Sequence, residues 1–497
     1  MKIMTIAAAG CAAAMTVAAA GCAAANAVET AKYAETVDEG FVSLFNGKDL
    51  AGWCGATHLY GVETIKEKMA GTGAVKESTV LACFPERRNR GGGGNLCTEK
   101  EYRNFILRFE FQMPENGNNG LGIRMPDINK DAAYFAMCEL QLLDDGGSAY
   151  YDKAAKKDKL KPYQYTGSVY GIVPVLRDNF RQTRGKAGNF TGGGSYVHKP
   201  GRWNFEEVKV VGSEIEVYLN GILVTKADVS KFKGDGDTPD HRKHPGLHTP
   251  KGRIGWLGHG SHVRWRNIRI KELPDDAKMS DICPRQTEQC PAGFKTYFAG
   301  KVEDLANWKG VTTAEGFDNP KKRQAATPEK RAAMQKIADG QMAEHWSVRN
   351  GNLFFDGMEG GYSLATKKDY KDFEMWVDWR TVSIQGDSGL YLRGSPQVQI
   401  WDAHNQWGIG SGGLYNNKKN PSRALSIADR QVGDWNRFYI KMVGEKVTVR
   451  LNGKTVVDNT TLENYWDRSQ PIFPCEQIEL QCHGDPIEFK NIFIREL

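Results

Sequence analysis

The sequence predicts an all-β protein made of two tandem β-sandwich domains of the jelly-roll type. The chain repeats itself over more than 200 residues, since Trp203-Asn204 and Asn220-Gly221 recur as Trp435-Asn436 and Asn452-Gly453. Solenoid repeats run only about 20–50 residues, so a unit of this size indicates a duplicated domain. The 55 glycines among 497 residues are typical of a protein with many turns.

The segments between these turns have the pattern of half-buried strands. Residues 105–111 (Phe-Ile-Leu-Arg-Phe-Glu-Phe) and 373–379 (Phe-Glu-Met-Trp-Val-Asp-Trp) alternate between apolar and polar side chains, which is the two-residue period of a strand. Asn220-Gly221 and Asn452-Gly453 each separate two such runs, and Asn-Gly favours the positive φ angles of a tight hairpin turn. Residues 317–343 break the pattern and predict one or two helices.

Changes in composition along the chain divide it into a leader, two domains and a linker. Residues 1–27 predict a signal peptide, because Lys2 precedes an apolar run and Ala25-Asn26-Ala27 fits signal-peptidase cleavage before Val28. From this signal we expect a secreted or periplasmic protein. Cys22 is the alternative attachment site for a lipoprotein anchor. No later segment is apolar enough to span a membrane. We expect the first domain at 40–273, a polar linker at 274–291 and the second domain at 292–497.

Charge and cysteine usage exclude some classes of function. The net charge of +6 is spread over the chain, whereas a nucleic-acid binder concentrates its basic residues. Cys283 and Cys290 predict a disulfide in the linker rather than a metal site. His241, His244 and His248 have the spacing of metal ligands, but Pro245-Gly246 breaks any helix there. We expect a loop lining the binding groove and assign no metal or cofactor, although a divalent cation stays open.

Polar side chains share one face of a predicted strand in each copy. Glu139 and Gln141 alternate with leucines, and Gln397 and Gln399 do so in the second copy. Neighbouring strands bring Arg124 and Arg393, whose guanidinium groups could hold a carboxylate or a pair of sugar hydroxyls. We expect these faces to line a groove, although such side chains could also form an internal polar network.

Histidines and aromatic residues complete the two predicted grooves. His259-Gly260 and His483-Gly484 precede the last strand of each copy, and histidine suits acid–base chemistry near neutral pH. Glu479 and Gln481 lead to His483, whereas the first copy has Gly255 and Leu257 there. Aromatic side chains could stack on sugar rings, and the candidates are Tyr170, Trp401, Trp407 and Tyr415.

These motifs resemble the 3-keto-disaccharide hydrolase family along most of both domains. The segments that carry the resemblance are 41–50 with Trp53, 139–144, 244–247, 258–260, 386–389, 396–402 and the two Asn-Ile-x-Ile-x-Glu-Leu ends. The resemblance implies a fold like that of concanavalin A and laminarinases, and secreted enzymes that cleave glycosides oxidised at C3. A base removes the C2 proton, the aglycone leaves from C1, and water adds afterwards.

By match to the family's Glu-x-Gln-x-x-Asp pattern, the resemblance implies that Glu139 is the base. Its expected catalytic neighbours are His259, Asp144 and Arg124, with Gln141, Tyr170 and His244 binding substrate. The second domain has Gln397 at the position of Glu139, although Asp402, Glu479 or His483 could substitute. We expect the first domain to carry the chemistry and the second to bind glycan or hold a divergent site, formed by Arg393, Gln397, Gln399, Trp401, Asp402 and His483.

Two other functions fit the same residues. A non-catalytic tandem lectin-like protein would bind carbohydrate through both domains without turnover. A conventional retaining or inverting glycosidase needs two carboxylates that flank one bond, and Glu139 with Asp144 could supply them. The extent of the resemblance favours the keto-sugar hydrolase.

Overall fold

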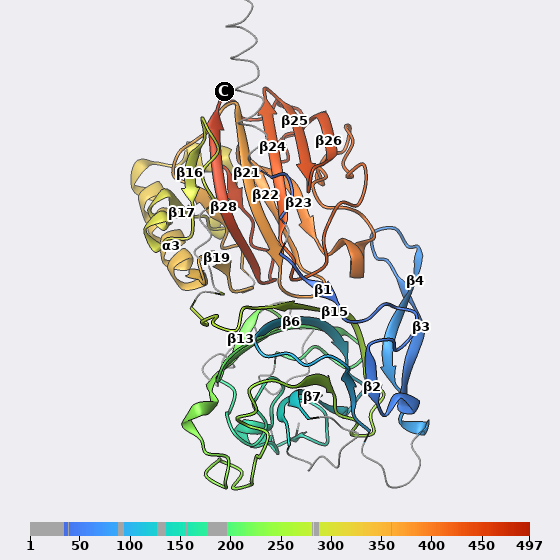
Figure 1. Ribbon diagram of the computed structural model, residues 1–497. Coiled ribbons are helices and arrows are strands. Elements are labelled where there is room, and N and C mark those ends of the chain that lie inside the picture. Colours follow the sequence, from blue (N-terminus) through green and yellow to red (C-terminus); the bar gives the residue numbers. More distant parts are fainter. Residues whose placement is uncertain are drawn as a thin grey trace, which may run out of the picture.

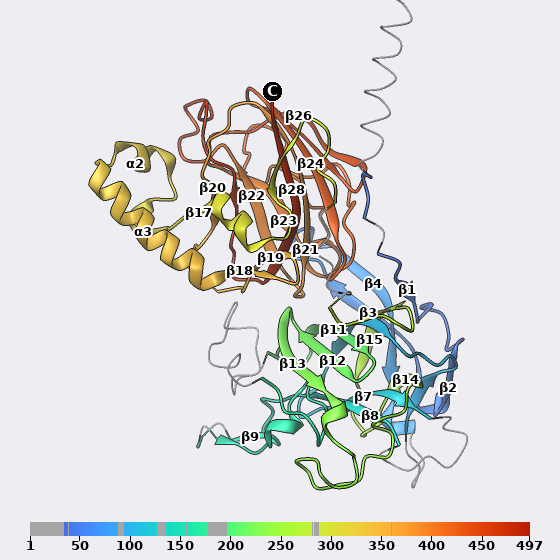
Figure 2. The same cartoon turned by 60° about the vertical axis from the view of Figure 1, so that its left-hand side comes forward.

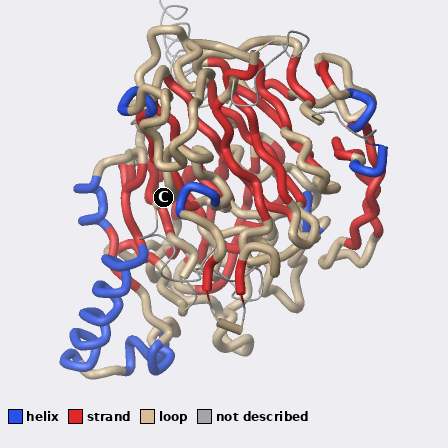
Figure 3. Tube along the Cα trace, turned by 90° about the horizontal axis from the view of Figure 1, so that it is seen from below, coloured by secondary structure: helices blue, strands red, loops and turns tan. Residues whose placement is uncertain are grey.

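Two β-sandwiches, one against the other, make up the described chain (Figure 1). The structure is a computed structural model, and it describes residues 34–497 apart from 38, 88–93, 127–135, 153, 156, 177–195, 281, 283–287 and 359. The predicted signal peptide, Cys22, Val28 and Cys283 lie outside the described residues. Strands dominate both halves (Figure 3). No helix in the described ranges has the length and apolar composition needed to cross a membrane.

The first domain stacks an eight-stranded sheet on a five-stranded sheet. In spatial order, the larger sheet contains β13 (Ile222–Asp228), β12 (Glu214–Leu219), β11 (Trp203–Val211), β6 (Phe105–Gln112), β15 (Arg264–Glu272), β4 (Val75–Cys83) and β3 (Tyr60–Lys68), with β1 (Val42–Ser43) also paired to β15. The smaller sheet contains β2 (Trp53–Gly55), β5 (Leu96–Thr98), β14 (Arg253–Trp256), β7 (Asn118–Met125) and β8 (Cys138–Leu143). A separate two-stranded ribbon joins β9 (Tyr151–Asp152) to β10 (Lys157–Asp158).

The second domain repeats this arrangement. Its larger sheet contains β18 (Trp346–Arg349), β19 (Asn352–Phe355), β28 (Ile487–Glu496), β21 (Phe373–Thr381), β24 (Asn436–Val443), β25 (Lys446–Leu451) and β26 (Lys454–Thr461), with β16 (Lys295–Phe298) on β28. Its smaller sheet contains β17 (Trp308–Gly310), β20 (Leu364–Thr366), β27 (Glu479–Leu480), β22 (Asp387–Leu392) and β23 (Ser395–Trp401). The predicted all-β class with two tandem jelly-roll β-sandwich domains is confirmed.

Each core lies between its two sheets, as the alternating patterns predict. In the first domain, Leu107 and Phe109 of β6 join Leu140 and Leu142 of β8 in one fully buried apolar cluster. Residues with the opposite parity, such as Glu139 on β8, must therefore point to the outer face of the sheet. This parity decides which side chains are available for a site.

The repeated Trp-Asn and Asn-Gly motifs serve the fold. Asn220 and Asn452 have φ angles of 46° and 49° in their hairpin turns, as the Asn-Gly pattern predicts. The Nδ2 group of Asn220 donates to Oδ1 of Asn204 at 2.9 Å, and Asn452 donates in the same way to Asn436 at 2.8 Å. These asparagines fasten the hairpin of each domain to its neighbouring strand.

The helical insertion predicted at 317–343 forms α2 (Pro320–Ala325) and α3 (Pro328–His345). Thr327 caps α3, because its side chain accepts a hydrogen bond from the Lys330 N–H. The helices cover one edge of the second domain, at β17 (Figure 2). Short helices elsewhere are η1 (Thr57–Leu59), η2 (Pro85–Arg87), η3 (Pro162–Gln164), η6 (Val229–Lys231), η7 (Val302–Asn307), η8 (Ala314–Gly316) and η9 (Ala403–Trp407).

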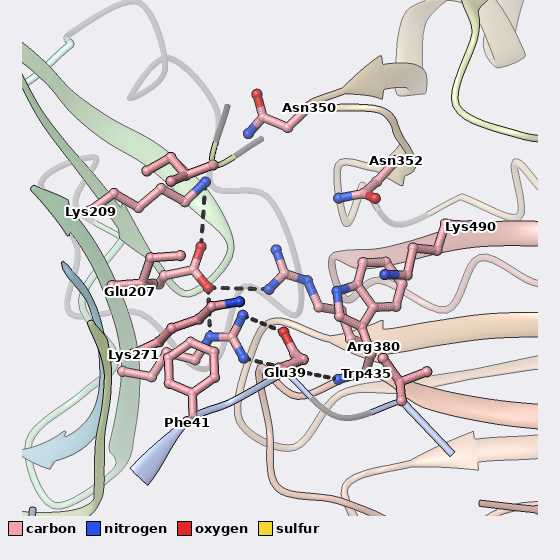
Figure 4. A pocket seen from close by; sticks show the side chains of 14 residues that line it. Glu39, Phe41, Glu207, Lys209, Lys271, Asn350, Asn352, Arg380, Trp435 and Lys490 are labelled. Carbon is pink, nitrogen blue, oxygen red and sulfur yellow. Dashed lines mark hydrogen bonds and ion pairs between the residues drawn. The ribbon is translucent and has the colours of Figure 1, made fainter. Parts of the chain in front are cut away.

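The two domains meet over a buried network of ion pairs. Glu207 of the first domain accepts from Nε of its neighbour Arg108 at 2.7 Å and from Nη1 of Arg380, across the interface, at 3.2 Å. Arg380 also donates to Glu488 at 2.6 Å. Burial raises the pKa of Glu207, but the guanidinium groups of Arg380 and Arg108 outweigh it and hold that pKa well below its usual value. These groups surround a small cavity of about 130 Å³ (Figure 4).

A segment before β1 also joins the domains, and we call residues 34–41 the N-terminal strap. The backbone oxygen of Ala34 accepts a hydrogen bond from Arg437, and Glu35 pairs with Arg450 at 2.6 Å, so the strap starts on the second domain. Glu39 then accepts from Arg108 of the first domain at 3.0 Å and from the Trp435 N–H of the second at 3.0 Å. The strap therefore touches both domains before the chain enters the first.

Candidate active site

The outer face of the first five-stranded sheet carries the carboxylate that the sequence singles out. Glu139 lies on this face with Gln141, and its register partner Gly122 pairs in turn with Gly255. A Cβ atom on Gly120 would lie 2.4 Å from Glu139 Oε1. Glycines on the neighbouring strands thus leave the Glu139 side chain room to lie across the sheet.

His259 meets Glu139 on this face. It follows β14, and its Nε2 atom lies 3.6 Å from Glu139 Oε1, with side chains 24% and 12% exposed. The structure thus brings together the predicted base and the predicted histidine. Both groups reach solvent, so they can act on a ligand placed against the sheet.

A loop beside β8 brings Tyr170 to the same place. The Tyr170 N–H donates to the Glu139 carbonyl oxygen at 2.9 Å, and the Gln141 N–H donates to Ser168 at 3.1 Å. The Tyr170 side chain is partly exposed, which leaves it available for stacking on a sugar ring. Gln141 is buried, and its Oε1 atom accepts from the Leu142 N–H at 3.2 Å.

Asp144 and Asp402, at matching positions of the two copies, hold backbone turns. Oδ2 of Asp144 accepts from the Asn116 N–H at 2.9 Å, and Oδ2 of Asp402 accepts from the Gln385 N–H at 3.0 Å. Asn116 and Gln385 have φ angles of 54° and 68°, so each aspartate stabilises a turn with a left-handed residue. Both aspartates are buried, and we assign them a structural role in place of the predicted catalytic and binding roles.

Arg124 and Arg393 are also structural. Both are buried at positive φ angles. The guanidinium group of Arg124 donates to the carbonyl oxygens of Leu247 and Gly212, and that of Arg393 donates to those of Pro474 and Gly444. Because these donors contact the backbone, we assign Arg124 and Arg393 a structural role in place of the predicted catalytic role of Arg124 and the predicted substrate-binding role of Arg393.

Two of the three histidine side chains of 241–248 have separate partners. His244 is buried with Nε2 3.0 Å from Asp240 Oδ1, and His248 Nε2 lies 2.8 Å from the Phe232 carbonyl oxygen. A Cβ on Gly246 would lie 2.2 Å from the backbone of Ala136, so this loop packs directly before β8. In the described residues, no three His, Cys, Asp or Glu side chains are grouped as metal ligands. A Cβ on Gly171 would lie 3.2 Å from His244 Cε1, so His244 packs beside the loop that carries Tyr170.

Cys290, the described partner of the predicted linker disulfide, has a free thiol. Its Sγ atom lies 3.3 Å from the Phe294 carbonyl oxygen. The predicted disulfide stays a prediction, because its other cysteine, Cys283, lies outside the described residues.

The second five-stranded sheet carries a different set of side chains on its outer face. Gln397, at the position of Glu139, donates to Gln399, which donates to Asp387 Oδ1 at 2.7 Å. Oδ2 of Asp387 lies 3.4 Å from Nδ1 of His483, whose side chain is 47% exposed. The predicted Gln397, Gln399 and His483 thus come together through Asp387, which the sequence reading did not select.

Trp401 ends β23 and supports the contact to the first domain. It is buried, stacks on Trp407 with ring centroids 4.8 Å apart, and donates through Nε1 to Ile409 at 2.8 Å. Trp407 belongs to η9, a single π-helical turn whose backbone accepts from the Gly71 N–H at 3.0 Å. Trp401 therefore packs within the protein, which overturns its predicted role in stacking on sugar.

Glu479 is the carboxylate on this second face that the predicted site omitted. It pairs with Tyr391 across β27 and β22, in the place that Gly255 and Gly122 occupy in the first domain. Burial raises the pKa of Glu479 to about 7, with Glu476 and Asp318 adding to it while Arg323 and a hydrogen bond from Gln477 oppose it. The comparison of the two repeats indicates Glu479 only as a possible substitute for the base, because the first copy has Gly255 at this position.

Comparisons with known proteins agree with the duplicated sandwich. The family described as 3-keto-alpha-glucoside-1,2-lyase-like domain matches residues 40–271 and again residues 293–495. A 3-keto-disaccharide hydrolase of Bacteroides thetaiotaomicron is 25% identical over 259 residues, which cover 47% of this chain and 79% of that protein.

Two solved structures from Parabacteroides distasonis, provisionally classified as glycosyl hydrolases, also match. They are 25% and 24% identical, cover 47% and 48% of this chain and 99% of their own, and give TM-scores of 0.33 and 0.34. Because the family matches both domains, the chain belongs to the 3-keto-alpha-glucoside-1,2-lyase-like family, in two tandem copies.

Proposed function

We propose that the first domain cleaves 3-keto-glycosides by elimination, with Glu139 as the base. The observation that carries the proposal is the contact of Glu139 with His259 at 3.6 Å on an outer sheet face with glycines beside it. The name of the Bacteroides relative supports the substrate class. Export of the protein, predicted from residues 1–27, belongs to the same proposal.

The ketone at C3 makes the chemistry accessible to one carboxylate. The Glu139 carboxylate takes the C2 proton, and the electron pair left on C2 is delocalised onto the C3 oxygen as an enolate. The enolate then re-forms the ketone while the C1–O bond breaks, and the aglycone leaves with a proton that His259 donates. Water adds to the resulting C1–C2 double bond and gives the free 3-keto sugar. Positioned acid–base groups of this kind contribute about 10²–10⁴-fold in rate.

The geometry disfavours the two-carboxylate glycosidase. That mechanism needs a second carboxylate facing the same bond, and Asp144 was the candidate. Asp144 is 1% exposed and holds the Asn116 N–H. The elimination route needs only Glu139 and His259, which the described site brings together.

The test compares a 3-keto-glucoside with its unoxidised parent, using the whole protein. We expect cleavage of the keto form alone, and a slower rate when deuterium replaces hydrogen at C2. Glu139→Gln should lower kcat by about 10²–10⁴-fold, since it removes the base and keeps the shape. Glu77→Gln, an exposed carboxylate of β4, is the matched control and should keep full activity.

Three results would contradict the proposal. Full activity in Glu139→Gln would show that Glu139 is not the base. Equal cleavage of the unoxidised glucoside would rule out elimination, which needs the C3 ketone. Carbohydrate binding by both domains without any turnover would make the protein lectin-like. The same assay with a chelator tests whether activity requires a divalent cation. Loss of activity would make His241, His244 and His248 candidate metal ligands again.

A further inference from the structure

The second domain contains a cavity of about 360 Å³ on the outer face of its smaller sheet. Glu479, Gln481 and Tyr391 form its sheet side, and Thr313 and Asp318, from the segment before α2, line it as well. The volume lies within the range of about 300–1,000 Å³ that is typical of small-molecule sites. Nothing in the first domain matches the Glu479 carboxylate, since Gly255 stands there.

Two buried oxygen atoms on the lining have no protein partner. They are Glu479 Oε2 and Gln481 Oε1, on side chains of residues 1% and 7% exposed. Their other polar atoms are held in place, since Gln477 donates to Glu479 Oε1 at 2.7 Å and Gln481 donates to the Tyr391 hydroxyl at 3.3 Å. A buried polar atom without a partner destabilises the folded state, because it has lost its hydrogen bonds to water. A ligand that carries hydroxyl groups would satisfy both.

The charges around the cavity favour a neutral ligand. No Lys or Arg belongs to the described lining, while Asp318 does. The charged and titratable groups that face Glu479 are Asp318, Arg323, Lys309, Tyr391, Glu476 and His483. Arg323 is engaged by Glu476 at 2.8 Å, outside the lining. A carboxylate ligand would therefore meet the Asp318 carboxyl on a described lining that holds no Lys or Arg side chain.

We propose that this cavity is a second sugar site, which binds a neutral sugar unit through hydrogen bonds from the protonated Glu479 carboxyl and to Gln481. Sugar hydroxyls both donate and accept, so one pair of neighbouring hydroxyls can accept from the Glu479 O–H and donate to Gln481 Oε1. The site does not depend on turnover in the first domain. We expect this site to exclude uronic acids, because its described lining offers no Lys or Arg to pair with their carboxylate.

The protonated form of Glu479 gives the site a pH dependence with a defined sign. Burial raises the pKa of this carboxyl to about 7, so the hydrogen-bond donor is present below pH 7 and lost above it. Burial also raises the pKa of the Cys482 thiol, on the same lining, to about 11, so the thiol stays neutral in this range. We expect affinity to fall about tenfold between pH 6 and pH 8 if only the protonated form binds.

The experiment is calorimetric titration of the whole protein with methyl α-glucoside and methyl α-glucuronide at pH 6 and pH 8. In the wild type we expect the glucoside alone to bind through this site, more weakly at pH 8. Glu479→Gln keeps an N–H donor without a titrating proton, so it should bind equally at both pH values. Glu479→Ala should lose the binding. Glu344→Gln, an exposed carboxylate on α3, is the matched control and should behave as the wild type.

Several results would overturn the second site. These are glucoside binding that Glu479→Ala leaves intact, a pH dependence that persists in Glu479→Gln, glucuronide bound as tightly as glucoside, or no binding at all. Thermal unfolding of each variant separates a lost site from a lost fold. Repeating the titration in Glu139→Gln keeps this result separate from the proposed function, because that variant should lose turnover and keep this binding.

Discussion

The two domains share one frame, yet their outer sheet faces differ in where the carboxylate stands. In the first domain Glu139 lies on β8, with Gly122 and Gly255 beside it. In the second domain the β23 position is Gln397, and Glu479 lies across the sheet on β27. Residues kept at matching positions, such as Asp144 with Asp402, hold turns. Among the acidic residues, the matching aspartates maintain turns, whereas the glutamates differ in position; the matching His259 and His483 lie on both outer faces.

The largest expected effect on stability concerns the interface that fixes the two faces relative to each other. Arg380→Ala leaves Glu207 and Glu488 without a shared cation in a buried network. Breaking a buried pair by removing one partner costs about 3–5 kcal/mol. Calorimetry should show a lower melting temperature, and the two domains should unfold separately. A single unshifted transition would contradict a coupled interface.

A smaller loss tests whether matching aspartates are structural. Asp402→Ala removes an acceptor used by the Gln385 and Asn405 N–H groups, and hydrogen bonds to charged groups contribute about 1.5–3 kcal/mol. We expect denaturant unfolding to show this loss and keto-glucoside cleavage to stay far above that of Glu139→Gln. If cleavage fell as severely as in Glu139→Gln while stability stayed unchanged, Asp402 would have a catalytic role.

The cores differ as well, and this predicts a gain in stability. Glu206 on β11 is fully buried between register partners Phe109 and Leu219, without a partner for either carboxyl oxygen, whereas the second domain has Phe438 there. Glu206→Leu should stabilise the first domain by up to about 2 kcal/mol at neutral pH.

This gain should depend on pH. Burial raises the pKa of Glu206 well above its usual value. Above pH 4.5 the unfolded chain ionises this group while the folded domain keeps it neutral, so wild-type stability falls as pH rises. The advantage of Glu206→Leu should therefore grow from pH 4 to pH 8, and unfolding midpoints at both pH values measure it. An advantage independent of pH would show that Glu206 is not neutral in the fold.

The smallest expected loss of stability concerns an exposed ion pair, which serves as the reference for the buried groups above. Lys66 and Glu77 pair at 2.9 Å with side chains 69% and 59% exposed. Lys66→Ala should cost less than about 1 kcal/mol, because solvent screens exposed pairs. A larger loss of stability would call into question the contrast with the Arg380 network.

Sequence patterns predicted the fold well because they record which face of each strand is buried. The alternation around Glu139 and Gln141, the Asn-Gly hairpins and the insertion at 317–343 all follow from local periodicity. The roles of Arg124 and Asp144 could not be predicted, because their partners are backbone atoms such as Gly212 and Asn116. Recurrence in both copies indicated these residues, but a duplicated turn keeps its hydrogen-bonding side chain as reliably as a duplicated site does.

For Glu479, the sequence predicts which face of the sheet the side chain lies on but not what surrounds it. The sequence places it on a polar face that leads to His483, but the insertion that lines its cavity, through Thr313 and Asp318, joins it only in three dimensions. The raised pKa of Glu479 follows from that burial. Strand periodicity gives the orientation of a side chain, whereas its environment depends on loops distant in the chain.

The N-terminal strap sets an order of events for a chain made from its first residue onward. Glu35 and Glu39 emerge early, but their partners Arg450 and Trp435 lie 415 and 396 residues later. The first domain can therefore complete its own sheets, with Glu39 on Arg108, while Glu35 still lacks its partner. The strap closes only after β24 and β25 have formed, so its closure requires the central strands of the second domain.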